Sequence, residues 1–156
     1  MADPDMDAIR AALTVHPRHA ALAEGRQRMD GLAAQFPLGP DIEVQPVNAG
    51  SVAAEWTASP HVDPTWIVTF LHGGGYVTGS LRSHRHMVAQ AGRKAQATTF
   101  AARYRLALEH PFPAAQKDAV EADRFLLAQP SPARIALAGE EARGGLALAM
   151  LTSLRA

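Results

Sequence analysis

The sequence has 156 residues, with 15 Lys plus Arg, 15 Asp plus Glu and no cysteine. This length suits a single domain, and the balanced charge gives no electrostatic footprint for nucleic acid or an anionic membrane. The lack of thiols excludes disulfides, cysteine nucleophiles and thiolate metal sites, which leaves a small neutral partner as the simplest expectation. Residues 1–7 are acidic with no apolar run behind them. We therefore expect neither a signal peptide nor a membrane anchor, and a cytoplasmic location.

Apolar residues recur at helical spacing over residues 6–36 and predict two short amphipathic helices, separated at Pro17. The Pro and Gly residues that follow mark a break, so residues 1–40 are predicted to form a helical, cap-like segment. Residues 41–47 and 52–57 then have the pattern of two strands joined by a turn at residues 48–50. This pattern predicts an antiparallel hairpin at the edge of a sheet.

Strands alternate with helices in the rest of the chain. The run at residues 66–71 is short, apolar and β-branched, as expected for a strand covered on both faces. A helix from about Ser83 follows, with Val88, Ala91 and Ala95 on its inner face, and then a strand at 98–102. After a loop at 104–112, a second helix is predicted behind Pro113, with an inner face of Ala115, Ala119, Ala122 and Leu126. A strand at 134–138 and a buried helix at 144–155 complete the predicted elements. This alternation predicts an α/β fold with a mostly parallel, doubly wound sheet, whose ligand chemistry lies at the carboxyl ends of the strands.

The first predicted buried strand runs directly into His72-Gly73-Gly74-Gly75-Tyr76. Successive glycines let backbone N–H groups face a cavity with no side chain in the way, which suits the binding of an oxyanion. A flexible turn and a phosphate cradle are the alternatives. A nucleotide loop is expected to have the spacing G-x-G-x-x-G or a neighbouring Lys, and neither is present.

Four segments, in the same order, resemble the hormone-sensitive-lipase-like esterases. Residues 72–76 are similar to the HGGG motif, and residues 104–107 with 109–115 are similar to the stretch YRLAPEHPFPAA. Residues 135–139 with 144–149 resemble the strand, nucleophile elbow and helix of that family, and the hairpin through Glu55 and Trp56 fits its early strands. The resemblance covers residues 41–156, which we interpret as the N-terminal half of an α/β-hydrolase domain with the C-terminal half absent.

The resemblance implies a carboxylic-ester hydrolase, an esterase or lipase, that acts on a small acyl ester and needs no metal or other cofactor. Gly74, Gly75 and Ala142 would donate hydrogen bonds to the oxyanion. His72 and Gly73, and also Gly139 and Glu140, would complete the two motifs. The helices of residues 1–40 would correspond to the cap over the acyl pocket.

The chain departs from the family at the nucleophile. The family's elbow has the sequence G-D-S-A-G-G, whereas here the frame is Gly139-Glu140-Glu141-Ala142-Arg143-Gly144-Gly145, so that Glu141 stands at the serine position. A carboxylate is a much poorer nucleophile towards an ester, and its adduct would be an anhydride. The family's acid and general-base histidine are expected beyond residue 156. We therefore predict that this chain has impaired catalysis.

Two further substitutions and the histidines complete the sequence interpretation. Arg103 stands where the family has Asp, and Leu108 stands where it has Pro. His84 and His86, at i and i+2, do not share a helix face and have no carboxylate cluster beside them, which argues against a metal site. We expect His72 and His110 to position loops and Glu109 to fix a loop as a hydrogen-bond acceptor.

Two other functional classes stay open. The first is a non-catalytic binding or regulatory pseudoenzyme, which would self-associate through an open sheet edge. A degenerate gene relic belongs to the same non-catalytic class. The second is an active esterase completed by a partner chain that supplies the acid and the histidine.

Overall fold

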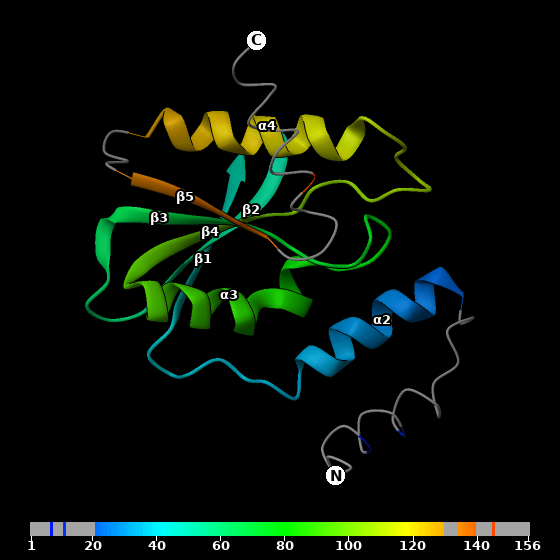
Figure 1. The fold of residues 1–156 in the computed structure, drawn as a ribbon, viewed down its shortest axis with the longest axis horizontal. Helices are drawn as coiled ribbons and strands as arrows, with labels where there is room; N and C mark the ends of the chain where they lie inside the picture. The colour runs from blue at the N-terminus through cyan, green and yellow to red at the C-terminus, as the bar shows by residue number, and fades with distance from the viewer. Residues whose placement is uncertain (1–6, 8–10, 12–20, 130–133, 140–144, 146–156) are drawn as a thin grey trace.

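The computed structural model of the chain describes residues 7, 11, 21–129, 134–139 and 145. The described elements follow one another as α2 (Leu22–Ala33), β1 (Glu43–Ala49), β2 (Val52–Ala58), β3 (Asp63–Leu71), α3 (Leu81–Ala95), β4 (Ala97–Ala102), α4 (Ala114–Leu127) and β5 (Arg134–Gly139). They form three layers, in which α4 covers one face of the sheet and α3 the other, while α2 lies against α3 (Figure 1).

The sheet has the strand order β1-β2-β4-β3-β5. β3 pairs in parallel with β4 and β5, whereas β2 pairs antiparallel with β1 and β4. The fold is of the α/β class, as predicted. Its mixed sheet consists of three parallel strands, β4, β3 and β5, with the antiparallel hairpin of β1 and β2 beside β4. Leu71 lies opposite both Ala102 and Gly139. The segments that follow β3, β4 and β5 therefore all start at the carboxyl ends of the parallel strands, where the ligand sites of such folds are found.

The predicted antiparallel hairpin is confirmed, but its turn lies further along the chain than expected. Ala49 pairs with Val52, which leaves only Gly50 and Ser51 in the turn. Gly50 has a φ of 64°, a left-handed conformation that glycine adopts at no steric cost. Its freedom explains why the strand continues to Ala49, two residues further than predicted. The carboxylate of Glu121 in α4 accepts hydrogen bonds from the Ser51 amide and hydroxyl, at 2.6 and 3.0 Å, and ties the turn to that helix.

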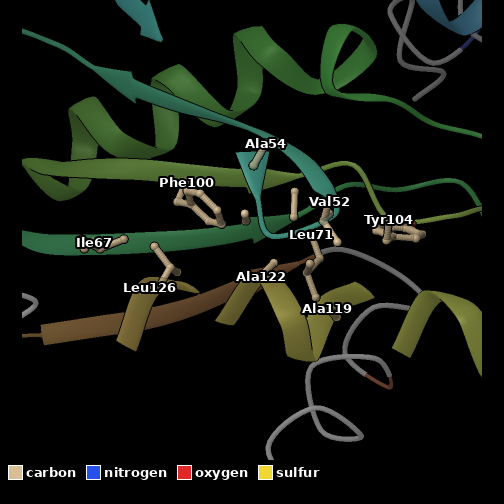
Figure 2. Close-up of a cluster of buried hydrophobic side chains, with 11 residues drawn as sticks. Val52, Ala54, Ile67, Leu71, Phe100, Tyr104, Ala119, Ala122 and Leu126 are labelled. Atoms are coloured by element: carbon tan, nitrogen blue, oxygen red, sulfur yellow. The ribbon is translucent and has the colours of Figure 1, made fainter. Parts of the chain in front are cut away.

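The main hydrophobic core lies between the sheet and α4 (Figure 2). Its members from α4 are Ala119, Ala122 and Leu126, as predicted, and they pack against side chains from four strands. Ala115, also predicted to be buried, is only partly buried at the edge of this cluster. Phe100 is completely buried and has Trp56 and Phe125 as aromatic neighbours, at ring-centroid distances of 4.8 and 5.9 Å. These aromatic contacts join β2, β4 and α4.

The inner face of α3 differs from the prediction. The helix begins at Leu81, with Ser80 as its N-cap, and its buried residues include Val88, as predicted, together with His84, Ala89 and Gly92. Ala91 is half-buried and Ala95 is exposed. The buried stripe follows i, i+4 spacing through residues 84, 88 and 92 because the helix approaches β4 closely at Gly92, where a methyl group would lie 2.7 Å from Cγ2 of Thr99.

The second predicted N-terminal helix is present as α2, while the first, before residue 21, and the final one, at 144–155, fall outside the described residues except for residues 7, 11 and 145. The boundary at residue 40 stays a prediction. None of the described helices has the length and apolar character needed to span a bilayer.

Candidate functional site

The glycine-rich loop of residues 72–80 starts where β3 ends, at the carboxyl edge of the parallel strands. Gly74 has a φ of 120°, and a methyl group there would lie 2.3 Å from Oγ1 and 2.5 Å from the carbonyl oxygen of Thr78. At Gly79, with a φ of 89°, a methyl group would lie 2.0 Å from the carbonyl oxygen of Gly73. The loop therefore closes on itself so tightly that only glycine fits at these two positions.

The three glycines after His72 do not have equivalent amides. The buried Gly73 amide donates a hydrogen bond of 2.9 Å to Nε2 of His84 in α3. By contrast, within the described residues the amides of Gly74 and Gly75 donate no hydrogen bond. Gly74 is half-buried and Gly75 exposed. The pair available for an outside acceptor is thus the pair named from the sequence, and His84 removes Gly73 from it.

His84 also has a defined hydrogen-bonding state. Its Nε2 accepts from the Gly73 amide, so in the neutral ring the proton is on Nδ1, which lies 2.8 Å from the Ser83 hydroxyl oxygen. His86 lies elsewhere, with its Nδ1 3.2 Å from the carbonyl oxygen of Pro37 and its ring 5.8 Å from that of Phe36. The two histidines thus have different neighbours, and no group of three possible metal ligands occurs in the described part of the chain.

A second loop, at residues 104–112 after β4, is joined to the glycine-rich loop by direct contacts. The Tyr104 hydroxyl donates to the carbonyl oxygen of His72 at 2.8 Å, and the two rings stack with centroids 4.3 Å apart. The Ala107 amide donates to the carbonyl oxygen of Tyr76 at 2.7 Å. His72 is buried in this stack and helps to position both loops, as predicted. The His110 side chain is exposed, and its amide donates to the Leu106 carbonyl oxygen.

Two ion pairs anchor the second loop. Arg105 forms a bidentate pair with the buried carboxylate of Asp118 in α4, whose Oδ2 also accepts from the Arg105 amide at 2.7 Å. Glu109 accepts from both terminal nitrogens of Arg26 in α2, at 2.6 and 2.9 Å. These hydrogen bonds lower the pKa of Glu109 from 4.5 to about 2. The expectation that Glu109 fixes the loop as an acceptor is confirmed, and its donor is in the N-terminal helix.

Two hollows flank the loops. A mostly apolar one of about 410 Å³ lies beside Gly75. Its lining residues are Gly75, Tyr76, Ala107, His110, Phe112, Pro113, Ala115 and Gln116. A second one, of about 470 Å³, is lined by more charged groups, among them Arg26, Arg103, Arg105 and Glu109. Gly75 lines the apolar hollow, whereas His72, Gly79 and Ser80 of the same loop line the charged one.

The structure places some of the elbow residues and leaves others outside its description. Gly139 ends β5, directly opposite Leu71 at the end of β3. Glu140, Glu141 and Ala142 lie outside the described residues. A methyl group on Gly145 would lie 3.7 Å from the Tyr76 hydroxyl oxygen, so Gly145 lies beside Tyr76 of the glycine-rich loop. Of the predicted elbow, the described residues Gly139 and Gly145 thus lie near the end of β3 and beside Tyr76, respectively. The position of the nucleophile itself stays a prediction.

Sequence reasoning missed Arg26 and the role of His84. Arg26 is in a helix of ordinary composition, and its partners are 51 and 83 residues away in sequence. No local pattern indicates such contacts. For His84 a signal existed, because a histidine near the start of the helix after a glycine loop can reach back to a loop amide.

A sheet of this topology, with a glycine-rich oxyanion-type loop after its central parallel strand, is the architecture of an α/β hydrolase. Residues 68–156 match the family model described as the alpha/beta hydrolase fold. The chain is 39% identical to an acetyl-hydrolase of Streptomyces hygroscopicus over 99% of its own length and 52% of that protein. It is also similar to the crystal structure of an esterase/lipase from an uncultured bacterium (40% identity, TM-score 0.88) and to that of an esterase from the bacterial hormone-sensitive lipase family (36% identity, TM-score 0.89).

The chain therefore belongs to the α/β-hydrolase-fold family, and it resembles the N-terminal half of esterases of the hormone-sensitive lipase type. In both structures 99% of this chain is matched, against 54% and 53% of the longer chain. The chain spans about half the length of the relatives it matches, and it corresponds to their N-terminal half.

Proposed function

We propose that this chain is the ester-binding half of a hormone-sensitive-lipase-type carboxylic-ester hydrolase, and that Glu141 makes it catalytically impaired. The observation that carries the proposal is the pair of Gly74 and Gly75 amides, free of hydrogen bonds within the described residues, at the carboxyl end of β3. Such amides can donate to an ester carbonyl oxygen and bind it more strongly as it becomes an oxyanion.

The substrate class follows from the surroundings of that pair. The apolar hollow of about 410 Å³ beside Gly75 has room for a small acyl group and offers it few polar partners. The name of the related acetyl-hydrolase supports a short acyl chain. Within this proposal the Ala142 amide is the third oxyanion donor, and the helices of residues 1–40 cover the acyl pocket.

Glu141 is the reason to expect little turnover. A serine alkoxide attacks the ester carbonyl after a histidine has taken its proton, and the acyl-enzyme that forms is an ester which water hydrolyses. Attack by a carboxylate would give an anhydride from a weaker nucleophile. A cytoplasmic location stays a prediction from the sequence.

The second candidate is a pseudoenzyme that binds an ester or acyl compound without hydrolysing it. The observation that favours it is that the glycine-rich loop keeps glycine at both of its sterically tight positions, 74 and 79, whereas the nucleophile position is occupied by Glu141. Self-association through a sheet edge belongs to this candidate.

The experiment compares hydrolysis of p-nitrophenyl acetate by wild type, Glu141→Ser and Glu141→Ala, each shown to be folded by circular dichroism. We expect wild type to be no faster than Glu141→Ala. Wild type faster than Glu141→Ala would contradict the impairment, whereas a Glu141→Ser variant that alone gains activity would support both the scaffold and the lost nucleophile.

If all three proteins are inactive, saturation-transfer NMR with ethyl acetate distinguishes the two candidates from a relic. Binding that is lost in Gly74→Ala supports an ester site at the loop. No transfer to wild type contradicts an ester-binding function for this chain.

A further inference from the structure

Polar contacts attach α2 to the rest of the molecule. The helix has no buried residue, and Leu32, an apolar residue in its last turn, is 50% exposed. Arg26 and Asp30 lie one turn apart, on the same face of the helix, and both reach the glycine-rich loop. Because apolar burial contributes little here, these two side chains are the main specific contacts between α2 and the candidate site.

Arg26 contacts both loops of the site with one guanidinium group. Its Nε donates to the carbonyl oxygen of Val77 at 2.8 Å, and its two terminal nitrogens donate to Glu109 at 2.6 and 2.9 Å. A planar guanidinium can hold three acceptors in fixed directions, which a lysine ammonium cannot do. Arg26 thus fixes the distance between residue 77 in the first loop and residue 109 in the second.

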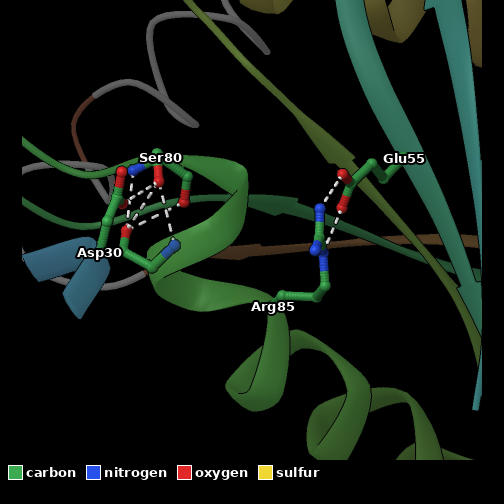
Figure 3. Close-up of polar contacts among 5 residues, drawn as sticks. Asp30, Glu55, Ser80 and Arg85 are labelled. Carbon is green, nitrogen blue, oxygen red and sulfur yellow. Dashed lines mark hydrogen bonds and ion pairs between the residues drawn. The ribbon is translucent and has the colours of Figure 1, made fainter. Parts of the chain in front are cut away.

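Asp30 holds the far end of the same loop. Its Oδ1 accepts from the Ser80 hydroxyl at 2.5 Å (Figure 3). Ser80 is also the N-cap of α3 and accepts from the Ser83 amide at 3.0 Å. The start of α3 and the end of the glycine-rich loop are therefore tied to α2 at one point.

The contact to Val77 acts directly on the glycines. The carbonyl oxygen of Gly74 accepts from the amides of Val77 and Thr78, at 3.1 and 2.9 Å, so that residues 74–78 form one closed turn. Holding the Val77 carbonyl holds this turn, and the turn sets the directions of the Gly74 and Gly75 amides. A chain of contacts thus runs from α2 to the pair of donors without an apolar interface.

We infer that Arg26 is a positioning residue through which α2 holds the glycine-rich loop in its donor-presenting conformation. The catalytic meaning of this inference rests on the proposed function, but the coupling itself does not. It can therefore be measured in the full chain without any ester, and a failure of hydrolysis would leave it standing.

The test is hydrogen–deuterium exchange, followed by mass spectrometry, on wild type, Arg26→Ala, Arg26→Lys and Arg28→Ala. Arg28 is an exposed arginine of the same helix and serves as the matched control. In Arg26→Ala we expect the amides of Val77, Thr78 and Ala107 to exchange roughly threefold to tenfold faster, the range for loss of a half-exposed, charge-assisted contact. The exchange rates in Arg26→Lys should lie between those of wild type and Arg26→Ala, and those in Arg28→Ala should match wild type.

The amides of β4 serve as the internal reference, because they report opening of the whole sheet. Unchanged exchange in residues 74–80 of Arg26→Ala would overturn the inference. Equal acceleration in β4 would overturn it as well, since Arg26 would then only stabilise the fold as a whole. Should Arg26→Ala fail to fold, Glu109→Gln weakens the same contact from the other loop. Glu109→Gln should raise the exchange rates of the same segments by a smaller factor. No increase in those segments would contradict the inference.

Discussion

The backbone amide of Gly73 and the Nε2 atom of His84 form a buried hydrogen bond of 2.9 Å, which links the start of the glycine-rich loop to α3. This bond takes one of three successive glycine amides out of reach of a ligand. It also places an α3 side chain under the loop, where its ring lies 5.6 Å from that of His72. Within the described residues only Gly74 and Gly75 of the three keep an amide without an acceptor, and α3 contributes to this difference as much as the loop does.

Replacement of His84 tests this link. His84→Ala leaves the buried Gly73 amide without its acceptor, so we expect the free energy of unfolding to fall by about 1–3 kcal/mol. Urea denaturation measures the change. His86→Ala is the matched control, because His86 is half-buried and its hydrogen bond is to Pro37, in the segment after α2. Its effect should stay within about 0.5 kcal/mol. Equal effects of the two variants would contradict the role given to His84.

The second prediction separates two neighbouring glycines. In Gly74→Ala the new methyl group collides with the backbone of Thr78 at a φ of 120°, and we expect a loss of roughly 2–3 kcal/mol in unfolding free energy, as for strongly strained backbone. In Gly75→Ala the methyl group enters open space at a φ of 59°, and the cost should be only about 1 kcal/mol. Thermal unfolding of both variants measures the difference. A Gly75→Ala variant as unstable as Gly74→Ala would mean that the loop conformation is different.

The sequence predicted the features that arise from local chemistry. The buried strand β3, the loop after it and the hairpin could be recognised because β-branched runs and glycine clusters restrict the backbone within a few residues. The inner face of α4 followed from its 3.6-residue period. The alternation of strands and helices then gave the fold class, and the motif spacing gave the family.

What the sequence could not give are contacts between distant segments. The turn of the hairpin was misplaced because Gly50 adopts a conformation that only the closed hairpin defines. The inner face of α3 was partly wrong because Gly92 and β4 set the orientation of the helix, and no helical period contains that information. The bonds from Arg26 to the two loops depend on how α2 lies on α3, which is decided by the tertiary structure alone.

The third prediction concerns pH. Because the pKa of Glu109 falls from 4.5 to about 2 on folding, chiefly through its hydrogen bond to Arg26, the unfolded chain binds the proton first. The stability that Glu109 contributes is therefore complete above pH 4.5 and is lost as the pH falls towards 2. We expect the difference in unfolding free energy between wild type and Glu109→Gln to shrink over this window.

Hydrogen bonds from Thr65 lower the pKa of Asp63 as well. Asp63→Asn therefore provides the control, because it should remove a different part of the acid dependence and leave the Glu109 part in place. Salt should weaken the Glu109 effect, because the Glu109 side chain is half exposed. A wild-type minus Glu109→Gln difference that is constant from pH 6 to pH 2 would contradict the ion pair.

The last prediction compares two ion pairs made by α3. Arg85 forms a bidentate pair with Glu55 of β2 (Figure 3), and the Glu55 side chain is only 10% exposed. Arg93 donates from one terminal nitrogen to both carboxylate oxygens of Asp41, and both side chains are more than 40% exposed. Arg85→Ala leaves a charge buried without its partner and should lower the unfolding free energy by about 2–3 kcal/mol, somewhat below the cost of breaking a fully buried pair. Arg93→Ala should cost less than about 1 kcal/mol.

Urea denaturation of the two variants gives the comparison, and a double variant decides its cause. If the loss in Arg85→Ala comes from the unpaired carboxylate, then replacing Glu55 by Met in the same chain removes the buried charge and should restore much of the stability. If the loss comes instead from the contacts of the Arg85 side chain with β2, the double variant should be no more stable than Arg85→Ala. Restoration would show that Glu55 is tolerated in the sheet only because α3 brings Arg85 to it.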